Sequence, residues 1–257
     1  MPTLEHSGLN YDSSAATQDK LEAARSRLIV ALDVPDAAAA ASVVERLEGR
    51  CRWFKVGLEL FTSAGPAVLE PILNRGLKVF LDLKFHDIPN TVAGAVRSAA
   101  ALGVHMLTVH AGGGPAMLAA AREAVSGRAH PPELLAVTVL TSMDAAQLGA
   151  VGVSHGVGDQ VEMLCRLGIA AGFRGFVCSP QEIARLRGMT GPEGVLVIPG
   201  IRPAGAETGD QRRIATPGDA LRDGASYLVV GRPITQAGDP AAAVEAIVAE
   251  MAGSIRA

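Results

Sequence analysis

Short apolar runs rich in Val, Ile and Leu alternate along the chain with longer segments in which apolar residues recur at helical spacing. Gly and Pro lie at nearly every junction between the two kinds of segment, which is typical of turns. The apolar runs predict eight strands, at residues 28–32, 53–57, 77–84, 104–110, 134–140, 175–178, 195–198 and 227–230.

The segments between these runs predict helices, for example over residues 36–47, 64–74, 91–101 and 114–126. Asp36 is well placed to be the N-cap of the first of them.

Strands that are each followed by a helix, with no change of composition to mark a linker, predict an α/β protein. We expect one domain over residues 27–257, a (β/α)8 TIM barrel. A doubly wound open sheet is the alternative, but no GxGxxG motif follows the first strand. Residues 1–26 are predicted to form a polar N-terminal extension with a short helix over residues 18–27.

Composition narrows the possible partners and location. The formal net charge of −3 argues against nucleic-acid binding through bulk charge. The longest uncharged stretch, residues 98–121, contains two histidines, three successive glycines and Pro115, so it predicts a helix end, a strand and a loop, with no membrane partner. Three cysteines without a CxxC pair, and the lack of an apolar leader, favour a reducing cytoplasmic location.

The most informative segment runs from Asp82 to Thr91 and reads Asp-Leu-Lys-Phe-His-Asp-Ile-Pro-Asn-Thr. Because side chains alternate faces along a strand, Asp82 and Lys84 should share one face at the end of the third strand. Asp87 follows just before the turn formed by Ile88 and its neighbours. Three ionisable groups so close together indicate a proton-transfer site, whereas the alternative is a structural ion pair in the barrel mouth.

Polar residues also lie at the C-terminal ends of other predicted strands, where TIM barrels carry their active sites. They are Asp33 after the first strand, Lys55 in the second, Thr141 and Ser142 after the fifth, Arg202 after the seventh and Gly231 with Arg232 after the eighth, together with Gln211 in the loop before the seventh helix.

The seventh and eighth loops of such barrels often bind phosphate, which the two arginines and the bare backbone of Gly231 would suit. Each residue also has a simpler interpretation. Asp33 could be a helix cap, and an arginine after a glycine is most often a solvated loop residue. His86, His105 and His110 lack a recognisable metal spacing, so we expect them in the core or beside the site.

These motifs together resemble the bacterial orotidine 5′-phosphate decarboxylases over roughly residues 27–250. The resemblance is carried by residues 28–33, 54–57, 82–91, 139–143, 199–203, 209–213 and 230–235. The block Asp-x-Lys-x-x-Asp followed by Ile-Pro-Asn-Thr is its most specific part, and the other motifs occur in the expected order.

The resemblance implies an enzyme that forms UMP and CO2 without a cofactor or a metal. Lys84 would protonate C6 of the pyrimidine, and Asp82 would lie beside the substrate carboxylate. Lys55 and Asp87 would complete an array of alternating charges, with Asp87 contributed by the other subunit of a homodimer.

The resemblance also implies the substrate contacts. The nucleotide would be bound by Asp33 and Lys55 at the ribose, by Thr91 and Ile88 near the shared interface, by Thr141 or Ser142 at the base, and by Arg202, Gln211, Gly231 and Arg232 at the phosphate. A closing loop is expected over residues 202–213.

Two alternatives remain at this point. The Mg2+-dependent 3-keto-gulonate 6-phosphate decarboxylases and hexulose-phosphate synthases share the Asp-x-Lys-x-x-Asp arrangement. They carry an acidic metal ligand on the second strand, where this chain has Lys55, which would repel a divalent cation. A nucleotide-binding barrel without catalytic activity is the other alternative, and it would not require Lys84 between two acids.

Overall fold

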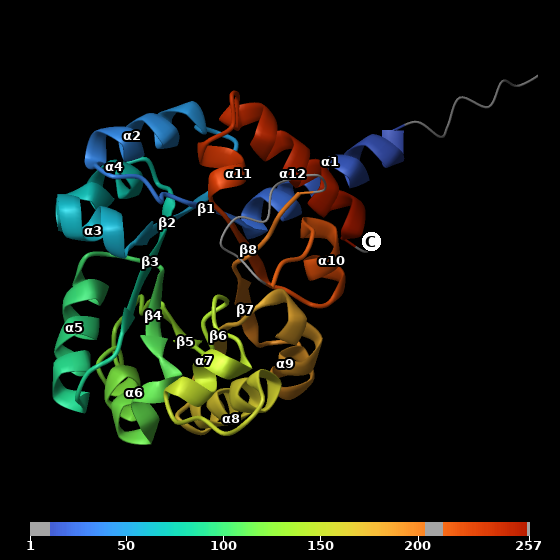
Figure 1. Ribbon diagram of the computed structural model, residues 1–257. Coiled ribbons are helices and arrows are strands. Elements are labelled where there is room, and N and C mark those ends of the chain that lie inside the picture. Colours follow the sequence, from blue (N-terminus) through green and yellow to red (C-terminus); the bar gives the residue numbers. More distant parts are fainter. Residues whose placement is uncertain (1–10, 204–212, 256–257) are drawn as a thin grey trace, which may run out of the picture.

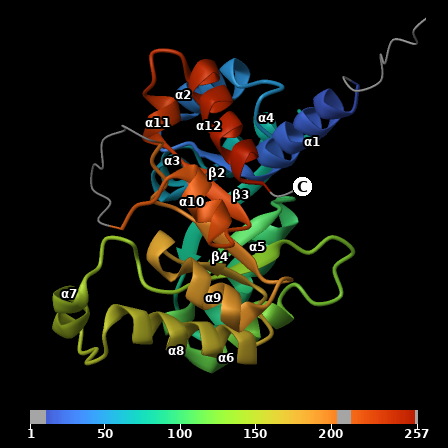
Figure 2. The ribbon, with the colours of Figure 1, turned by 90° about the vertical axis from the view of Figure 1, so that its right-hand side faces the viewer.

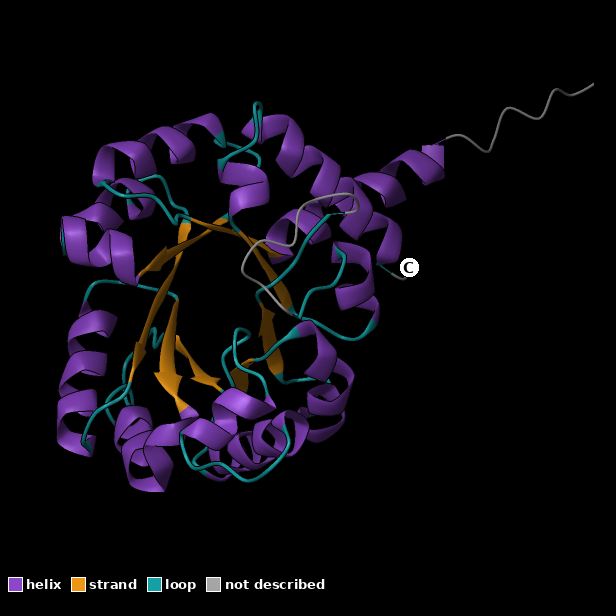
Figure 3. Cartoon of the chain, in the orientation of Figure 1, coloured by secondary structure: helices purple, strands orange, loops and turns teal. Residues whose placement is uncertain are grey.

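The computed structural model describes residues 11–203 and 213–255, which form a closed barrel of parallel strands surrounded by helices (Figures 1 and 3). Each strand pairs with its neighbours in sequence, and β1 pairs with β8 to close the ring. The strands are β1 (Leu28–Ala31), β2 (Trp53–Gly57), β3 (Lys78–Phe85), β4 (Met106–His110), β5 (Glu133–Val137), β6 (Gly175–Val177), β7 (Val195–Ile198) and β8 (Tyr227–Val230). The predicted TIM barrel is therefore confirmed.

Helices cover the outside of this ring on every side, as the two perpendicular views show (Figures 1 and 2). They are α1 (Tyr11–Arg27), α2 (Ala37–Arg46), α3 (Leu58–Ala64), α4 (Glu70–Leu73), α5 (Pro89–Ala101), α6 (Gly114–Glu123), α7 (Ala145–Ala150), α8 (Val157–Ala170), α9 (Ile183–Thr190), α10 (Pro217–Arg222), α11 (Arg232–Thr235) and α12 (Pro240–Ser254). None of the helices within the described residues combines the length and the apolar character that crossing a membrane requires.

Several boundaries differ from the sequence prediction. The helix expected over residues 64–74 is a 3₁₀ turn (Pro66–Leu69) followed by α4, and it is separated from α3 by Gly65, which adopts a positive φ of 66°. The N-terminal helix begins at Tyr11 and not at residue 18. Strand β5 ends at Val137, three residues before the expected end at 140. Asp36 caps α2 as predicted, since its side chain accepts a hydrogen bond from the Ala39 N–H.

The barrel has two apolar cores. The larger one lies between the strands and the helices and contains, for example, Phe54, Leu81 and Phe176. The smaller one fills the barrel interior and consists of Ile29, Ala31, Trp53, Phe80, Met106, Leu135, Val197 and Val229. Because the interior is packed with side chains, a ligand can enter only at the ends of the strands, where the loops begin.

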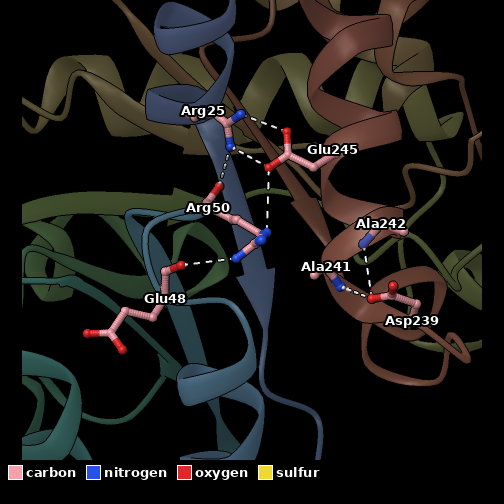
Figure 4. A network of polar contacts seen from close by, with 7 residues as sticks. All are labelled: Arg25, Glu48, Arg50, Asp239, Ala241, Ala242 and Glu245. Atoms are coloured by element: carbon pink, nitrogen blue, oxygen red, sulfur yellow. Dashed lines mark hydrogen bonds and ion pairs between the residues drawn. The ribbon is translucent and has the colours of Figure 1, made fainter.

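Helix α1 is fixed to the last helix by an ion-pair network (Figure 4). The Arg25 guanidinium donates to both carboxylate oxygens of Glu245 in α12, at 2.9 and 2.6 Å. Arg50 approaches the same carboxylate at 3.7 Å. Asp239 caps the start of α12 by accepting hydrogen bonds from the N–H groups of Ala241 and Ala242. The C-terminal end of α1 is therefore attached to α12.

Replacing Gly168 by Ala should destabilise the barrel. A Cβ atom at Gly168 would lie 2.5 Å from Phe176 Cε1 and 3.4 Å from the Ala136 Cβ, so α8 would have to move away from the sheet. We expect a loss of roughly 1–3 kcal/mol in the free energy of unfolding, measured by urea denaturation. Gly188→Ala in α9 is the matched control, because nothing lies within 4 Å of its added Cβ. An unchanged midpoint for Gly168→Ala would contradict the close packing of α8.

Candidate active site

A cavity of about 420 Å3 opens at the C-terminal ends of the strands. Its floor is apolar and belongs to the barrel interior, with Ala31, Phe80, Val197 and Val229. Its walls are polar and include Asp33, Lys55, Asp82, Lys84, Thr141, Arg202, Gly231, Arg232 and Gln236. Eight of the residues singled out from the sequence, all of those just named except Gln236, are thus brought together from segments far apart in the chain.

A row of alternating charges crosses this cavity. Lys55 Nζ on β2 lies 2.9 Å from Asp33 Oδ1 after β1 and 3.7 Å from Asp82 Oδ2 on β3. Lys84 Nζ lies 2.9 Å from each oxygen of the same Asp82 carboxylate. Asp82 is therefore shared by two ammonium groups. Since both Lys55 and Asp82 are only 9% exposed, water screens this array weakly.

The pKa of Asp82 lies below its usual value despite its burial. Burial alone would raise the pKa of this carboxyl, but the attraction of Lys55 and Lys84 and the hydrogen bonds from Lys84 and Thr108 outweigh it. The carboxylate therefore stays ionised near neutral pH. The row is therefore a set of fixed charges.

The backbone at Lys84 departs from a regular strand. Lys84 has a φ of 49°, the only positive φ of a non-glycine residue within the described part of the chain. The pairing of β3 with β4 changes register between Leu81 and Phe85. Such a bulge re-aims a side chain, and strained backbone of this kind is concentrated at functional sites. The regular alternation of side chains along a strand does not predict this irregularity.

Two glycines leave room for the charged row. A Cβ atom at Gly57 would lie 3.0 Å from Lys55 Nζ, and one at Gly231 would lie 3.2 Å from Asp33 Oδ2. Both distances are shorter than ordinary contacts, so any larger residue would displace a charged group.

Two guanidinium groups also line the cavity. Arg202 follows β7 and is buried, with Nη1 donating to the Ile201 carbonyl at 2.9 Å, and Arg232 begins α11 after β8. Burial lowers the pKa of Arg202, and the positive charge of Arg232 lowers it further. Two guanidinium groups that line one cavity favour the binding of an anion. Gln211, predicted for the same end, and most of the expected closing loop lie outside the described residues.

Asp87, Ile88 and Thr91 lie at the turn into α5 and are exposed, with Ile88 exposed by 67%. The Asp87 carboxylate accepts a hydrogen bond from the Ile88 N–H at 2.6 Å. No ion pair joins it to Lys55 or Lys84, both of which lie in the described part of this chain. These three residues are therefore presented outward and do not belong to the row of charges within one subunit.

Thr141 lines the cavity from the loop after β5, whereas Ser142 is exposed and does not line it. Both were expected directly at the end of the fifth strand. Because β5 ends at Val137, a short loop of four residues between the strand and Ser142 carries Thr141 over the cavity.

Several residues of the site were missed in the sequence. Thr108 on β4 is fully buried and touches both Asp82 and Lys84. Within the run Met-Leu-Thr-Val-His it looks like an ordinary β-branched strand residue, so no local signal could have identified it. Gln236 after α11 also lines the cavity. His86 and His110 stack with ring centroids 5.3 Å apart, and His105 packs on Trp53.

The carboxylates of the site are not arranged as a metal-binding group. Asp33 and Asp82 could offer oxygen ligands, but the Lys55 ammonium lies between them at 2.9 and 3.7 Å. A divalent cation would have to displace this ammonium before it could bind both carboxylates. The charge that a metal would supply is already supplied by lysine.

The sequence of this chain is similar to those of known orotidine 5′-phosphate decarboxylases. The model of the orotidine 5′-phosphate decarboxylase / HUMPS family matches residues 26–247. The chain is 55% identical to the orotidine 5′-phosphate decarboxylase of Moorella thermoacetica over 234 residues, which cover 89% of this chain and 93% of the relative. It is 54% identical to that of Nitrosospira multiformis over 218 residues, or 84% and 89% of the two chains.

The fold comparison agrees. The crystal structure of orotidine 5′-phosphate decarboxylase from Lactobacillus acidophilus superimposes with a TM-score of 0.77 at 39% identity, over 88% of this chain and 99% of that one. A second crystal structure, of a conserved protein from Geobacillus kaustophilus, superimposes with a TM-score of 0.76 at 34% identity, over 87% and 99% of the two chains. The match of the family model over most of the chain, with relatives at such identity, means that this chain belongs to the orotidine 5′-phosphate decarboxylase / HUMPS family.

Proposed function

We propose that this chain decarboxylates orotidine 5′-phosphate to UMP and CO2 in pyrimidine biosynthesis, without a cofactor. The observation that carries the proposal is the Lys84 ammonium bound to a buried carboxylate in a cavity that two guanidinium groups also line. This arrangement fits a substrate with an acidic reacting end and a phosphate. We assign the catalytic unit to residues 27–257, preceded by the extension 1–26.

The reaction breaks the bond between C6 of the pyrimidine and its carboxylate. The electron pair remains at C6, CO2 departs, and a proton must reach C6. Lys84 is the proposed donor, because a fixed ammonium stabilises the developing negative charge at C6 more than it stabilises the ground state. It transfers one proton to C6, becomes neutral, and regains a proton from water after the product leaves.

Asp82 and Lys55 fix the position of this donor. The Asp82 carboxylate lies 2.9 Å from the Lys84 ammonium, and Lys55 balances its charge from the other side. In the proposed complex the substrate carboxylate would lie beside Asp82, and the departure of CO2 would relieve the contact between two negative groups. Catalysis then depends on charges that are arranged before the substrate binds.

The remaining groups are proposed to bind the nucleotide. Asp33, half exposed and hydrogen-bonded to Lys55, would accept hydrogen bonds from the ribose hydroxyls. Thr141, with its neighbour Ser142, would contact the base. Arg202 and Arg232, with Gly231 and Gln211, would bind the phosphate, whose dianion offsets the repulsion between the two guanidinium groups.

We further propose a homodimer in which Asp87, Ile88 and Thr91 contribute to the site of the partner. Their exposure and the lack of an ion pair between Asp87 and its own Lys84 support this assignment. The exposed Ile88 and Leu58, which follow β3 and β2, would supply apolar contacts at such an interface. A cytoplasmic location would suit the three free, buried thiols.

The first prediction concerns the proton donor. Lys84→Ala should lower kcat for UMP formation by at least about a thousand-fold, because it removes the acid and its charge. The affinity for UMP should change little, because the phosphate is bound elsewhere. Lys78→Ala is the control: Lys78 begins the same strand at the opposite end of the barrel, where it packs over Trp53. Retention of most of the wild-type kcat in Lys84→Ala would refute the assignment.

Chelation separates this function from that of the Mg2+-dependent members of the family. The rate of UMP formation should be the same after exhaustive treatment with EDTA, because Lys55 occupies the space between Asp33 and Asp82. The assay is repeated with added Mg2+ and with 3-keto-gulonate 6-phosphate as substrate. Activity that is lost with EDTA and restored by Mg2+ would favour the alternative.

Subunit mixing tests the shared site. Lys84→Ala and Asp87→Ala should each be nearly inactive, yet a mixed dimer would contain one site with both residues intact. After complete exchange of an equal mixture, half of the dimers are mixed and half of their sites are intact, so activity should return to roughly a quarter of wild type. Exchange is followed by native mass spectrometry, with each variant treated alone as the control. Exchange without recovery would mean that Asp87 acts within its own subunit.

A further inference from the structure

A single residue of β4 lies opposite the irregular part of β3. The strands pair Leu81 with Leu107 and then Phe85 with Val109, so Asp82, Leu83 and Lys84 together face only Thr108. Two of these three residues carry the charges closest to the proposed reaction. Thr108 is therefore the point at which the bulge is attached to the barrel.

The hydrogen bonds of Thr108 have only one possible direction. The Lys84 N–H donates to Thr108 Oγ1 at 2.8 Å, because a backbone N–H cannot accept. The hydroxyl has one proton, and the Asp82 Oδ1 that lies 3.0 Å away is an ionised acceptor. Thr108 is fully buried, so no water competes for these bonds. Removal of the hydroxyl would leave the Lys84 N–H without its acceptor and would leave Asp82 Oδ1 with the Lys84 ammonium as its remaining donor.

These contacts close a ring around the catalytic lysine. Asp82 Oδ1 accepts from the Thr108 hydroxyl at 3.0 Å and from Lys84 Nζ at 2.9 Å, while the same hydroxyl accepts from the backbone of Lys84. Lys84 is thus held at both ends, at its N–H and at its ammonium. Its φ of 49° is a conformation that a lysine seldom adopts without such support.

We propose that Thr108 is a positioning residue for the reaction, which acts by fixing the backbone of Lys84 and the carboxylate of Asp82 in one geometry. It touches neither the substrate nor the reacting carbon. The inference rests on the proposed function and adds a residue from β4 to the residues on which that function depends. An error of about 1 Å in the position of a proton donor can cost about a hundred-fold in rate.

The test compares Thr108→Val, which keeps the shape and removes the hydroxyl, with Thr108→Ser, which keeps the hydroxyl and removes a methyl group. We expect kcat for UMP formation to fall roughly 10- to 100-fold in Thr108→Val. The KM and the affinity for UMP should change less than about three-fold, because the groups that bind phosphate and ribose are intact. Thr108→Ser should recover most of the wild-type kcat.

Thr138→Val is the matched control. Thr138 is also a buried threonine, just beyond β5, but its Oγ1 donates to the Val177 carbonyl and it does not line the cavity. The loss of this hydroxyl should lower stability and leave kcat unchanged. If Thr108→Val does not fold, the comparison is made between Thr108→Ala and Thr108→Ser, which differ only in the hydroxyl. The kcat of Thr108→Ala should then be roughly 10- to 100-fold lower than that of Thr108→Ser.

The outcomes distinguish this inference from the proposed function. If wild-type protein forms no UMP, the proposed function fails. If wild-type protein is active and Thr108→Val retains full kcat, then Thr108 is a structural residue only and the inference is overturned. The same conclusion follows if Thr108→Ala and Thr108→Ser have equal kcat. A fall in kcat that Thr108→Ser does not restore would also overturn it, because the methyl group and not the hydroxyl would then be responsible.

Discussion

The arrangement of the site depends on one buried carboxylate, that of Asp82, which two ammonium groups share. An isolated carboxylate at this depth would be protonated, because burial disfavours its charge. Lys55 and Lys84 reverse that tendency and lower its pKa. Conversely, the carboxylate lets two cations lie in the same cavity without strong mutual repulsion. Removal of the Asp82 carboxylate would take this partner from Lys84 and leave Lys55 paired with Asp33, and the loss of a buried partner costs more than the loss of an exposed one.

The closed barrel makes such a concentration of charge possible. The members of the row come from β1, β2 and β3, whose C-terminal ends are adjacent because each strand pairs in parallel with the next. The well-packed interior, with Phe80 and Val197 beneath the cavity, excludes water from below and keeps the local dielectric low. The stability of the two apolar cores therefore supports a site that would be unfavourable by itself, including the left-handed backbone of Lys84.

Two groups of residues that line the cavity, those around Asp82 and the pair Arg202 and Arg232, differ in their electrostatic character. Around Asp82 the charges alternate and balance, so the region is suited to a reaction in which charge moves from a carboxylate to a ring carbon. Arg202 and Arg232 form a region of positive charge, and the pKa of Arg202 is lowered by burial first and by the charge of Arg232 second. The binding energy of an anionic group held by these two arginines would keep the reacting end of the same substrate in position, which is how remote contacts accelerate a reaction.

The sequence by itself determined the barrel and most of the residues that line its cavity. Eight apolar runs separated by helical segments specify the alternation, and parallel strands in a closed ring bring Asp33, Lys55 and Asp82 to one end. Only the tertiary structure decided the local geometry. The bulge at Lys84, the end of β5 at Val137 and the role of Thr108 depend on pairing between strands, because register and side-chain contacts across a sheet are long-range properties. A threonine in a strand looks the same in sequence whether its hydroxyl binds a buried charged pair or its side chain only packs in the core.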